Sequence, residues 1–338
     1  MNEQAAGNSE IAIIGGAGFI GRWLSRALAE SGEHVRTVDI ASPATDDAGT
    51  FQKASVTDLV DLSKALAGCK MIINLAAVHR DDVRPLSLYH DVNVTGAQNV
   101  CTAATSLGIE TLVFTSSVAV YGFAEGEPTE TTSPNPFNAY GRTKWEAECI
   151  YRAWQEEDPT VRRLVIVRPT VVFGPANRGN VYNLIAQLAR PRFVMVGDGT
   201  NRKSMAYVRN VAAFIAYVAR SEKLGAGQHI FNYCDAPDFD MNTLLRVVRE
   251  SLGKDPRPTV KLPHAVGTAI GSLFDIAATL SGRTFPVSRI RIQKFCANTV
   301  FSADRARATG FHAPYSLVEA LRETIAHEFL RGEPAIAK

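Results

Sequence analysis

The sequence Ile11-Ala12-Ile13-Ile14-Gly15-Gly16-Ala17-Gly18-Phe19-Ile20-Gly21 joins a short apolar run to a turn rich in glycine. The apolar run predicts a buried parallel strand, and apolar side chains that recur at helical spacing as far as Glu30 predict a helix. Glycines at positions 15, 18 and 21 permit a tight turn, a close approach of the backbone to a ligand and close helix–strand contact. The first N–H groups of such a helix and the positive end of its dipole attract a pyrophosphate. We therefore predict a dinucleotide-binding turn that uses Gly15, Gly18, Phe19, Ile20 and Gly21, although a glycine turn without a ligand has the same local pattern.

A carboxylate follows near the end of the next predicted strand, Val35–Ile40. Asp39 lies 21 residues after Gly18, where it can accept a hydrogen bond from a ribose hydroxyl. Because a carboxylate at this place repels a 2′-phosphate, NAD is favoured over NADP as the cofactor. Asp58 is a candidate for contact with the adenine edge, but it is also a suitable N-cap for the following helix, which needs no ligand.

Short apolar strands alternate with helices along the first half of the chain. Strands are predicted at 11–14, 35–40, 71–75, 111–115 and 164–167, and helices at 19–30, 58–67, 92–107 and 139–157. This alternation predicts an α/β fold with a Rossmann-like doubly wound parallel sheet. After Pro169 the alternation weakens, and helices are predicted at 181–189, 211–220, 241–252 and 316–330, with short strands between them. We predict an NAD-binding domain at 10–170, to which later segments can return, and a smaller C-terminal α/β substrate-binding region at 171–332.

Tyr140 and Lys144 are four residues apart on a predicted helix, so their side chains share one face. A free tyrosine has a pKa of about 10, and its use as a base near neutral pH needs a shift of roughly 3 units. A lysine ammonium one helical turn away and a positively charged nicotinamide ring both favour the phenolate. Ser116 and Ser117 follow a predicted strand at the sheet edge where such folds place ligands, and a hydroxyl there can hold a substrate oxygen.

The overall composition excludes some classes of function. The chain has 338 residues with 36 basic and 34 acidic side chains, and a net charge of +2 argues against a nucleic-acid binder. The five cysteines fit neither a disulfide framework nor a zinc motif, and the seven histidines show no ligand spacing, so no metal is expected. No secretory signal is evident at the start, and we expect a cytoplasmic protein. The apolar segment 265–280 contains Asp275 and is too short for an integral membrane segment; a buried or partner-facing helix is favoured over peripheral membrane contact.

Taken together, these motifs resemble those of the extended short-chain dehydrogenases/reductases, in the NAD-dependent sugar-nucleotide epimerase/dehydratase family. The resemblance covers about residues 10–330, and its motifs are Gly15–Gly21, Asp39, Asn74–Ala77, Asn93, Ser116–Gly122, Tyr140 with Lys144, and Arg168-Pro169. It implies that Ser117 is the active-site hydroxyl, Tyr140 the acid/base and Lys144 its electrostatic partner. It further implies that Ala76 and Pro169 line the cofactor through their backbones. Asn93 is expected to order the cofactor site through backbone hydrogen bonds.

The chain also departs from parts of the family pattern. Family dehydratases carry an Asp-Glu pair directly after the active-site hydroxyl, whereas this chain has Val118-Ala119, so 4,6-dehydration is not expected. The common Arg-Asp after the Gly-Asp-Gly loop is Lys203-Ser204 here, with Arg202 adjacent. Because a diphosphate needs cations, Arg202, Lys203 and Arg289 are candidate substrate ligands. His79 is a further candidate, or an ordinary loop histidine.

These features lead to one favoured function and two alternatives. The favoured function is an NAD-dependent epimerase of a nucleotide-diphosphate sugar, acting at C4 by transient oxidation to a keto sugar and re-reduction. The alternatives are a net reductase or dehydrogenase of a 4-keto sugar nucleotide or related secondary alcohol, and a non-catalytic NAD-binding protein. The resemblance also implies a homodimer that pairs through the predicted helix 139–157.

Overall fold

The structure, a computed structural model, describes residues 10–43, 49–80, 83–257, 260–281 and 289–330. The chain forms two compact units, each assembled from separate segments. The first unit contains the chain up to Thr170 together with Val208–Cys234 and Phe301–Pro314. The second unit contains Val171–Tyr207, Asp235–Val300 and the chain from Tyr315.

A seven-stranded parallel sheet forms the centre of the first unit. Its strands are β1 (Glu10–Ile14), β2 (Val35–Asp39), β3 (Thr50–Lys53), β4 (Cys69–Asn74), β5 (Thr111–Thr115), β6 (Arg163–Pro169) and β11 (Gly227–Tyr233). The order β11-β6-β5-β4-β1-β2-β3 reverses direction between β1 and β4. Ligands of doubly wound sheets bind outside the carboxyl ends of the strands at such a reversal. The predicted Rossmann-like fold is thereby confirmed.

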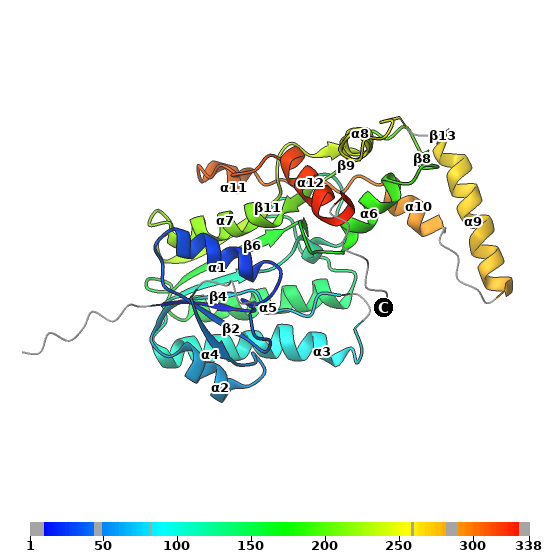
Figure 1. The fold of residues 1–338 in the computed structure, drawn as a ribbon. Helices are drawn as coiled ribbons and strands as arrows, with labels where there is room; N and C mark the ends of the chain where they lie inside the picture. Colours follow the sequence, from blue (N-terminus) through cyan, green and yellow to red (C-terminus); the bar gives the residue numbers. More distant parts are fainter. Residues whose placement is uncertain (1–9, 44–48, 81–82, 258–259, 282–288, 331–338) are drawn as a thin grey trace, which may run out of the picture. The chain divides into compact units, whose positions relative to one another are not determined.

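Helices cover both faces of this sheet (Figure 1). On one face α1 (Gly21–Glu30) packs against α7 (Val208–Arg220), and on the other α4 (Gly96–Leu107) packs between α2 (Leu59–Leu66) and α5 (Ala139–Glu156). The remaining elements are α3 (Ser87–His90), a π-helical turn (Asp91–Thr95), a 3-10 turn (Val118–Tyr121) and α11 (Asp304–Ala308). The helix predicted at 92–107 therefore begins as a π-helical segment.

Two strands of the sheet were given no residue range by the sequence prediction, and both lie at its edges. β3 is largely exposed and polar, so it lacks the apolar run that marks a buried strand. β11 follows α7 in the chain but returns to pair with β6, from Gly227 opposite Arg163 to Tyr233 opposite Pro169. A strand that joins a sheet from a distant segment shows no local signal of its partner.

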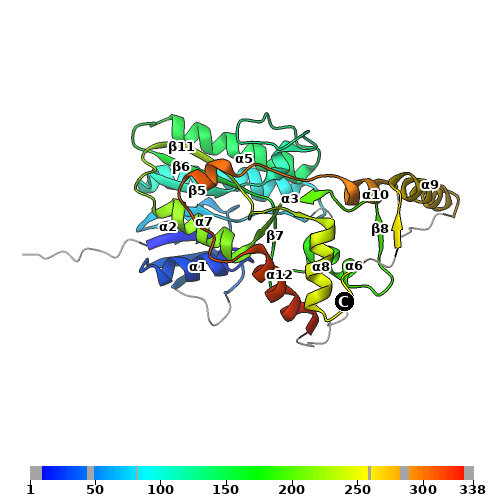
Figure 2. The same cartoon turned by 90° about the horizontal axis from the view of Figure 1, so that it is seen from above.

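The second unit contains three small strand pairs and a set of helices. Its strands are β7 (Val171–Phe173), β8 (Val194–Val196), β9 (Arg202–Lys203), β10 (Met205–Tyr207), β12 (Phe239–Asp240) and β13 (Val260–Leu262), paired as β10–β7, β12–β9 and β13–β8. Its helices are α6 (Asn180–Leu188), α8 (Met241–Ser251), α9 (His264–Ser281), α10 (Arg289–Cys296), α12 (Leu317–Ile325) and a π-helical turn (Ala326–Leu330). Figure 2 shows α8 beside α6 and α12, and these pairs are in contact. Within the described residues, no helix is both long and apolar enough to cross a bilayer.

Candidate active site

The glycine turn after β1 closes against the loop that follows β4. Gly15 has φ +75°, a conformation that other residues rarely adopt, and a Cβ there would lie 2.8 Å from the backbone nitrogen of Ala76. A Cβ at Gly21 would lie 2.4 Å from the carbonyl oxygen of Gly16. Both positions therefore exclude a side chain, because the turn packs closely against the loop after β4 and against the start of α1. This is the geometry that a dinucleotide pyrophosphate requires at a helix N-terminus.

Asp39 lies at this turn, where the sequence analysis expects it, and has a second role that was not foreseen. Its Oδ2 accepts a hydrogen bond from the N–H of Ala17 at 3.1 Å, and its Oδ1 accepts one from the N–H of Ala41 at 3.1 Å. The half-buried carboxylate thus ties the glycine turn to the end of β2. Contact between Asp39 and a ribose remains a prediction.

Asp58 has a structural role that accounts for it without a ligand. Its Oδ1 accepts hydrogen bonds from the N–H groups of Val60 and Asp61, each at 3.0 Å, so it caps α2. This matches the alternative that the sequence left open. Contact with adenine remains a prediction.

Asn93 connects the loop after β4 to the helix that carries Tyr140 and Lys144. The buried side chain accepts from the N–H of Val78 at 2.9 Å through Oδ1 and donates to the carbonyl of Val78 at 3.1 Å through Nδ2. Nδ2 also donates to Oγ1 of Thr143 at 2.9 Å. Asn93 therefore joins the loop after β4 to α5 through hydrogen bonds, and its part in ordering a cofactor site remains a prediction.

Lys144 is buried and anchored at the end of β5. Its Nζ donates to the carbonyl of Thr115 at 2.8 Å and lies 4.6 Å from the ring centroid of Phe114. Burial lowers the pKa of this ammonium to about 7, and the nearby Glu148 carboxylate opposes the shift. Tyr140 lies one turn earlier on α5 and is half-buried. The lysine is therefore a group whose charge changes near neutral pH.

Hydroxyl groups gather where β5 ends. Ser117 is half-buried, and its Oγ accepts from the N–H of Ala119 at 3.1 Å at the start of the 3-10 turn. Oγ1 of Thr115 and Oγ of Ser116 are buried and have no hydrogen-bond partner within the part of the chain that the structure describes. Buried hydroxyls are normally hydrogen-bonded, so these two indicate a place where a bound molecule or water completes the site.

The first unit brings most of the predicted site residues to one edge of the sheet. The glycine turn follows β1, Asp39 ends β2, Ala76 follows β4, Ser117 follows β5 and Pro169 ends β6. These positions are the carboxyl ends of parallel strands on both sides of the reversal in strand order. His79 lies exposed on the loop after β4. The residues present thus fit an NAD cofactor.

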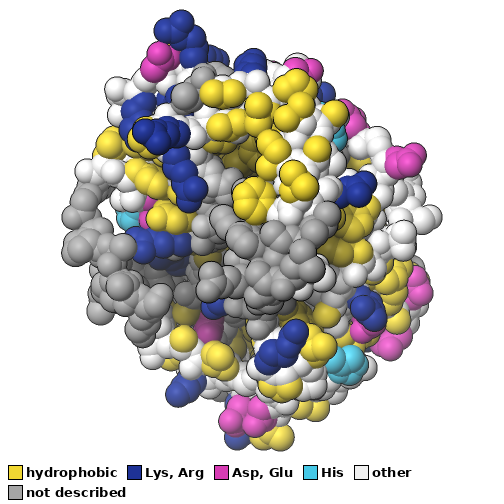
Figure 3. Space-filling model, turned by 90° about the vertical axis from the view of Figure 1, so that its right-hand side faces the viewer, with side chains coloured by type: hydrophobic (Ala, Val, Ile, Leu, Met, Phe, Trp, Pro, Cys, Tyr) yellow, Lys and Arg dark blue, Asp and Glu magenta, His cyan; other side chains and the backbone are white. Residues whose placement is uncertain are grey.

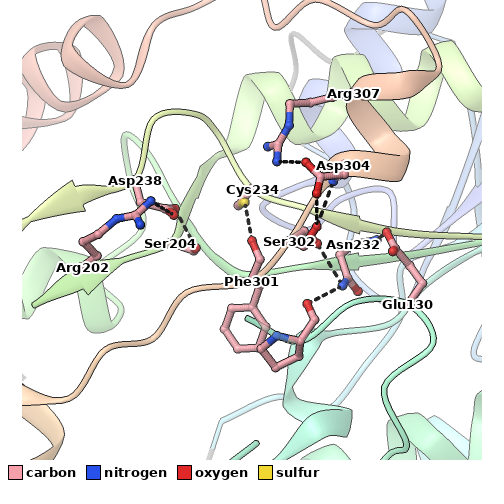
Figure 4. Close-up of polar contacts among 11 residues, drawn as sticks. Glu130, Arg202, Ser204, Asn232, Cys234, Asp238, Phe301, Ser302, Asp304 and Arg307 are labelled. Atoms are coloured by element: carbon pink, nitrogen blue, oxygen red, sulfur yellow. Dashed lines mark hydrogen bonds and ion pairs between the residues drawn. The ribbon is translucent and has the colours of Figure 1, made fainter. Parts of the chain in front are cut away.

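A buried ion pair, not predicted from the sequence, holds α5 against the central sheet. Arg168 on β6 binds Glu148 on α5 through two hydrogen bonds, Nε to Oε1 at 2.8 Å and Nη2 to Oε2 at 2.6 Å. Its Nη1 donates to the hydroxyl of Tyr121 at 2.6 Å, and that hydroxyl donates to Oδ1 of Asn232 at 2.7 Å. The backbone N–H of Asn232 in turn donates to Oε1 of Glu130 at 2.7 Å (Figure 4). The spacing of Glu148 four residues after Lys144 was a signal that these side chains share a helix face.

The candidate substrate cations lie in the second unit. Arg202 is half-exposed and pairs with Asp238, Nη2 to Oδ2 at 3.1 Å, as Figure 4 shows. Nζ of Lys203 donates to the carbonyl of Ala297 at 2.6 Å, and burial lowers its pKa to about 8. Arg289 is exposed at the start of α10.

A pocket of about 630 Å³ in the second unit identifies further candidates. Its lining includes Gly197, Asp198, Lys261, His264 and Asn298, but not the three cations predicted from sequence. Lys203 is nevertheless close, because its partner Ala297 lies between two lining residues, Cys296 and Asn298. Lys261 and His264 were missed because β13 reaches this place by pairing with β8, a contact with no local signal. Among the described residues, no group of His, Cys, Asp and Glu side chains is arranged to hold a metal ion.

Comparisons with known proteins agree with this geometry. The profile of the "NAD dependent epimerase/dehydratase family" matches residues 11–234. The N-acetyl-alpha-D-glucosaminyl-diphospho-ditrans,octacis-undecaprenol 4-epimerase of Escherichia coli O157:H7 is 44% identical over 327 residues, which cover 96% of this chain and 97% of that protein. The UDP-glucose 4-epimerase of Vibrio cholerae is 26% identical over 286 residues, covering 80% and 85% of the two chains.

Solved structures share the fold at lower identity. The UDP-glucose 4-epimerase of Thermus thermophilus in complex with NAD has a TM-score of 0.70 at 22% identity and covers 96% of this chain and 99% of its own. A second UDP-glucose 4-epimerase structure has a TM-score of 0.74 at 22% identity and covers 98% and 100%. The resemblance stated from the motifs is confirmed. The chain belongs to the NAD-dependent epimerase/dehydratase family and is an NAD-dependent enzyme of the extended short-chain dehydrogenase/reductase type.

Proposed function

We propose that this enzyme inverts C4 of a sugar that is carried on a diphosphate. One observation carries the proposal: the Escherichia coli relative, named as a 4-epimerase of a diphosphate-linked N-acetylglucosamine, is 44% identical along almost the whole chain. The position of Ser117, Tyr140 and Lys144 at the ligand-binding edge of the sheet supports the same chemistry.

The sequence motifs predict a nucleotide as the carrier on the diphosphate, whereas the Escherichia coli relative is named for a polyprenyl carrier. A nucleotide-diphosphate sugar, expected from the sequence, and a polyprenyl-diphosphate sugar, named for the relative, present the same sugar-diphosphate ester. The relative with the lipid carrier is 44% identical, whereas the UDP-glucose 4-epimerase is 26% identical. This difference favours a polyprenyl-diphosphate-linked N-acetylhexosamine as the substrate, with the nucleotide sugar as the alternative.

The reaction needs a group that moves one proton while the sugar changes oxidation state. NAD supplies the acceptor and donor of hydride when it is bound. The phenolate of Tyr140 takes the proton of the C4 hydroxyl. It returns this proton after the keto sugar has rotated and presents its other face for reduction. The hydroxyl of Ser117 donates to the same substrate oxygen and holds it in place. The protonated, positively charged form of Lys144 favours the phenolate of Tyr140. Nζ of Lys144 is held in place by the hydrogen bond that it donates to the carbonyl of Thr115, at 2.8 Å.

The diphosphate needs cations from the second unit. We assign this role to Arg202, Lys203 and Arg289, as predicted, and add Lys261 because it lines the pocket of that unit. Charge-assisted hydrogen bonds to phosphate oxygens are the interactions that such side chains provide.

The test is an assay with both carriers that reads stereochemistry and redox state together. The purified protein is incubated with N-acetylglucosamine on polyprenyl diphosphate, and separately with UDP-, GDP- and dTDP-sugars. The expected result is a C4 epimer, identified by NMR, with no net change in NADH absorbance. A stoichiometric change in NADH with a keto or deoxy product would replace the epimerase with the reductase. Tyr140→Phe is the control for turnover by contaminating enzymes.

Three broader expectations belong to the same proposal. We propose a homodimer that pairs through α5, a cytoplasmic location and a role in polysaccharide biosynthesis. None of the five cysteines, all of which are described, forms a disulfide, which is compatible with a reducing compartment. Light scattering coupled to size-exclusion chromatography measures the oligomeric state, and a monomer at micromolar concentration would contradict the dimer.

A further inference from the structure

One side of α9 packs closely against the rest of the second unit at two glycines, where there is no room for a side chain. A Cβ at Gly267 would lie 2.4 Å from Cγ1 of Val196 on β8, and a Cβ at Gly271 would lie 2.8 Å from the backbone nitrogen of Arg289. Oδ2 of Asp275, one further turn along, accepts from the N–H of Arg289 at 3.0 Å. Residues 267, 271 and 275 share a face at helical spacing, so this face of α9 is the packed one.

The opposite side of α9 carries an exposed apolar stripe. Val266, Ile270 and Leu273 are 44%, 37% and 66% exposed, and their spacing of four and three residues places them on one face. Ile290 at the start of α10 is 55% exposed. Figure 3 shows hydrophobic side chains gathered on this side of the molecule, with Lys and Arg side chains at their border. Exposed apolar side chains gathered on one face of a helix are typical of an interaction site.

The segment around this stripe is strongly basic. Residues 254–296 contain seven Lys and Arg but only two Asp, which gives a net charge of +5. The whole chain has a net charge of +2, so all the other residues together carry −3. Of these basic residues, Lys254, Arg257, Lys261 and Arg289 are exposed in the structure. Apolar side chains within a basic surround are typical of helices that lie in the headgroup region of anionic membranes.

We propose that the stripe Val266, Ile270 and Leu273 of α9, together with Ile290 of α10, docks the second unit onto the surface of an anionic phospholipid bilayer. The helix lies in the interface rather than across it, since no described helix is long and apolar enough to span a membrane. A second copy of the chain is a poorer occupant, because a symmetric contact would bring two segments of charge +5 together.

The purpose of this surface rests on the proposed function. A polyprenyl-diphosphate sugar is held in a bilayer by its lipid, and its headgroup lies at the membrane surface. His264, the first residue of α9, lines the pocket together with Lys261. The docked helix therefore brings this pocket to the depth at which the sugar diphosphate is found.

Vesicle co-sedimentation of the full-length protein tests the proposal. Vesicles of phosphatidylcholine mixed with phosphatidylglycerol should sediment the protein, vesicles of phosphatidylcholine alone should sediment far less, and added salt should weaken the binding. Leu273→Glu should lower the partition coefficient about tenfold or more, because it removes one buried leucine and adds a negative charge. Val60→Glu is the matched control, since Val60 is 65% exposed on α2 in the first unit. It should bind like the unchanged protein.

The outcomes separate this surface from the proposed activity. Epimerase turnover of Leu273→Glu, measured on a detergent-solubilised lipid-linked or nucleotide sugar, should stay unchanged. Vesicle binding without epimerisation of any sugar would overturn the proposed function but leave the surface intact. Failure of the unchanged protein to bind anionic vesicles would overturn the surface, as would undiminished binding by both Leu273→Glu and Ile270→Gln. A loss of oligomeric state in these variants without loss of vesicle binding would assign the stripe to a second copy instead.

Discussion

The two units hold their functional side chains in opposite ways. In the first unit, Lys144 is buried on the Thr115 carbonyl, and the helix that carries it is bound to the sheet by the fully buried Glu148–Arg168 pair. In the second unit, Arg202 is half-exposed and pairs with Asp238, and Arg289 is exposed. Lys144, the proposed partner of the phenolate of Tyr140, is thus fixed by a buried polar contact, whereas Arg202 and Arg289, two of the cations proposed for the diphosphate, lie at the surface.

This difference follows from what each task requires. Proton transfer needs donor and acceptor within hydrogen-bond reach, and a misplacement of one ångström has a large effect on rate. Recognition of a diphosphate by several cations tolerates the loss of any one of them. Substitutions in the first unit should therefore have large effects and those in the second unit small ones.

The largest effect is expected from Tyr140→Phe. Removal of the phenolic hydroxyl should lower kcat by roughly two to four decades, since it removes the general acid and base. Turnover measured by NMR on the substrate found above, with bound NAD assayed separately, checks this prediction. Tyr217→Phe is the matched control, because its hydroxyl only donates to the carbonyl of Thr309 at 2.7 Å. Normal turnover by Tyr140→Phe would remove this residue from the chemistry.

Glu148→Gln should have the next largest effect, and it acts on stability. It leaves the Arg168 guanidinium buried and without its counter-charge, which costs about 3–5 kcal/mol. The surface pair Glu157–Arg162 provides the comparison, because Glu157 is 65% exposed and Glu157→Gln should cost less than about 1 kcal/mol. Urea unfolding of both variants measures the two free energies. Equal losses would show that the buried pair does not hold α5 to the sheet.

Lys144→Met should change how stability depends on pH. The folded-state pKa of Lys144 is about 7, below its ordinary value, so from pH 7 upward the folded protein binds fewer protons than the unfolded chain. The cost of burying the cation is therefore complete below pH 7 and is relieved as the pH rises toward the ordinary lysine pKa. Unfolding of cofactor-free protein should show stability rising by a few kcal/mol over this range, a rise that Lys144→Met abolishes. Lys64→Met, at an exposed site, should retain it.

The smallest effects are expected in the second unit. Arg202→Gln should raise KM a few-fold and leave kcat unchanged, since it removes one of several cations and one half-exposed ion pair. Lys203 has a pKa of about 8, so its charge is lost above that pH and KM should rise there. Lys203→Gln should remove this rise. A large fall in kcat for either variant would contradict the contrast between the units.

The parts of the site that could be predicted are those that depend on residues close together in the sequence. The positive φ of Gly15 and the missing space at Gly21 require glycine at those positions, so the turn is visible in the sequence. The spacing of Tyr140 and Lys144 likewise follows from the helical repeat. Lys261 was missed because its place depends on the pairing of β13 with β8. The Glu148–Arg168 pair was missed although Arg168 belongs to one of the motifs, because it joins a helix to a strand 20 residues away.

The sequence by itself determined the alternation of strands and helices, the glycine turn and the helical spacing of Tyr140 and Lys144, since each depends on neighbours within a few positions. Only the tertiary structure decided which charges are buried and which are exposed. Burial gives Lys144 a pKa of about 7, although nothing in the local sequence distinguishes it from a surface lysine. The tertiary structure also decided that the apolar residues of α9 face outward, because two glycines turn the other side of the helix toward β8 and α10. Desolvation and exposure are properties of the assembled fold, and they arise from contacts between segments far apart in the chain.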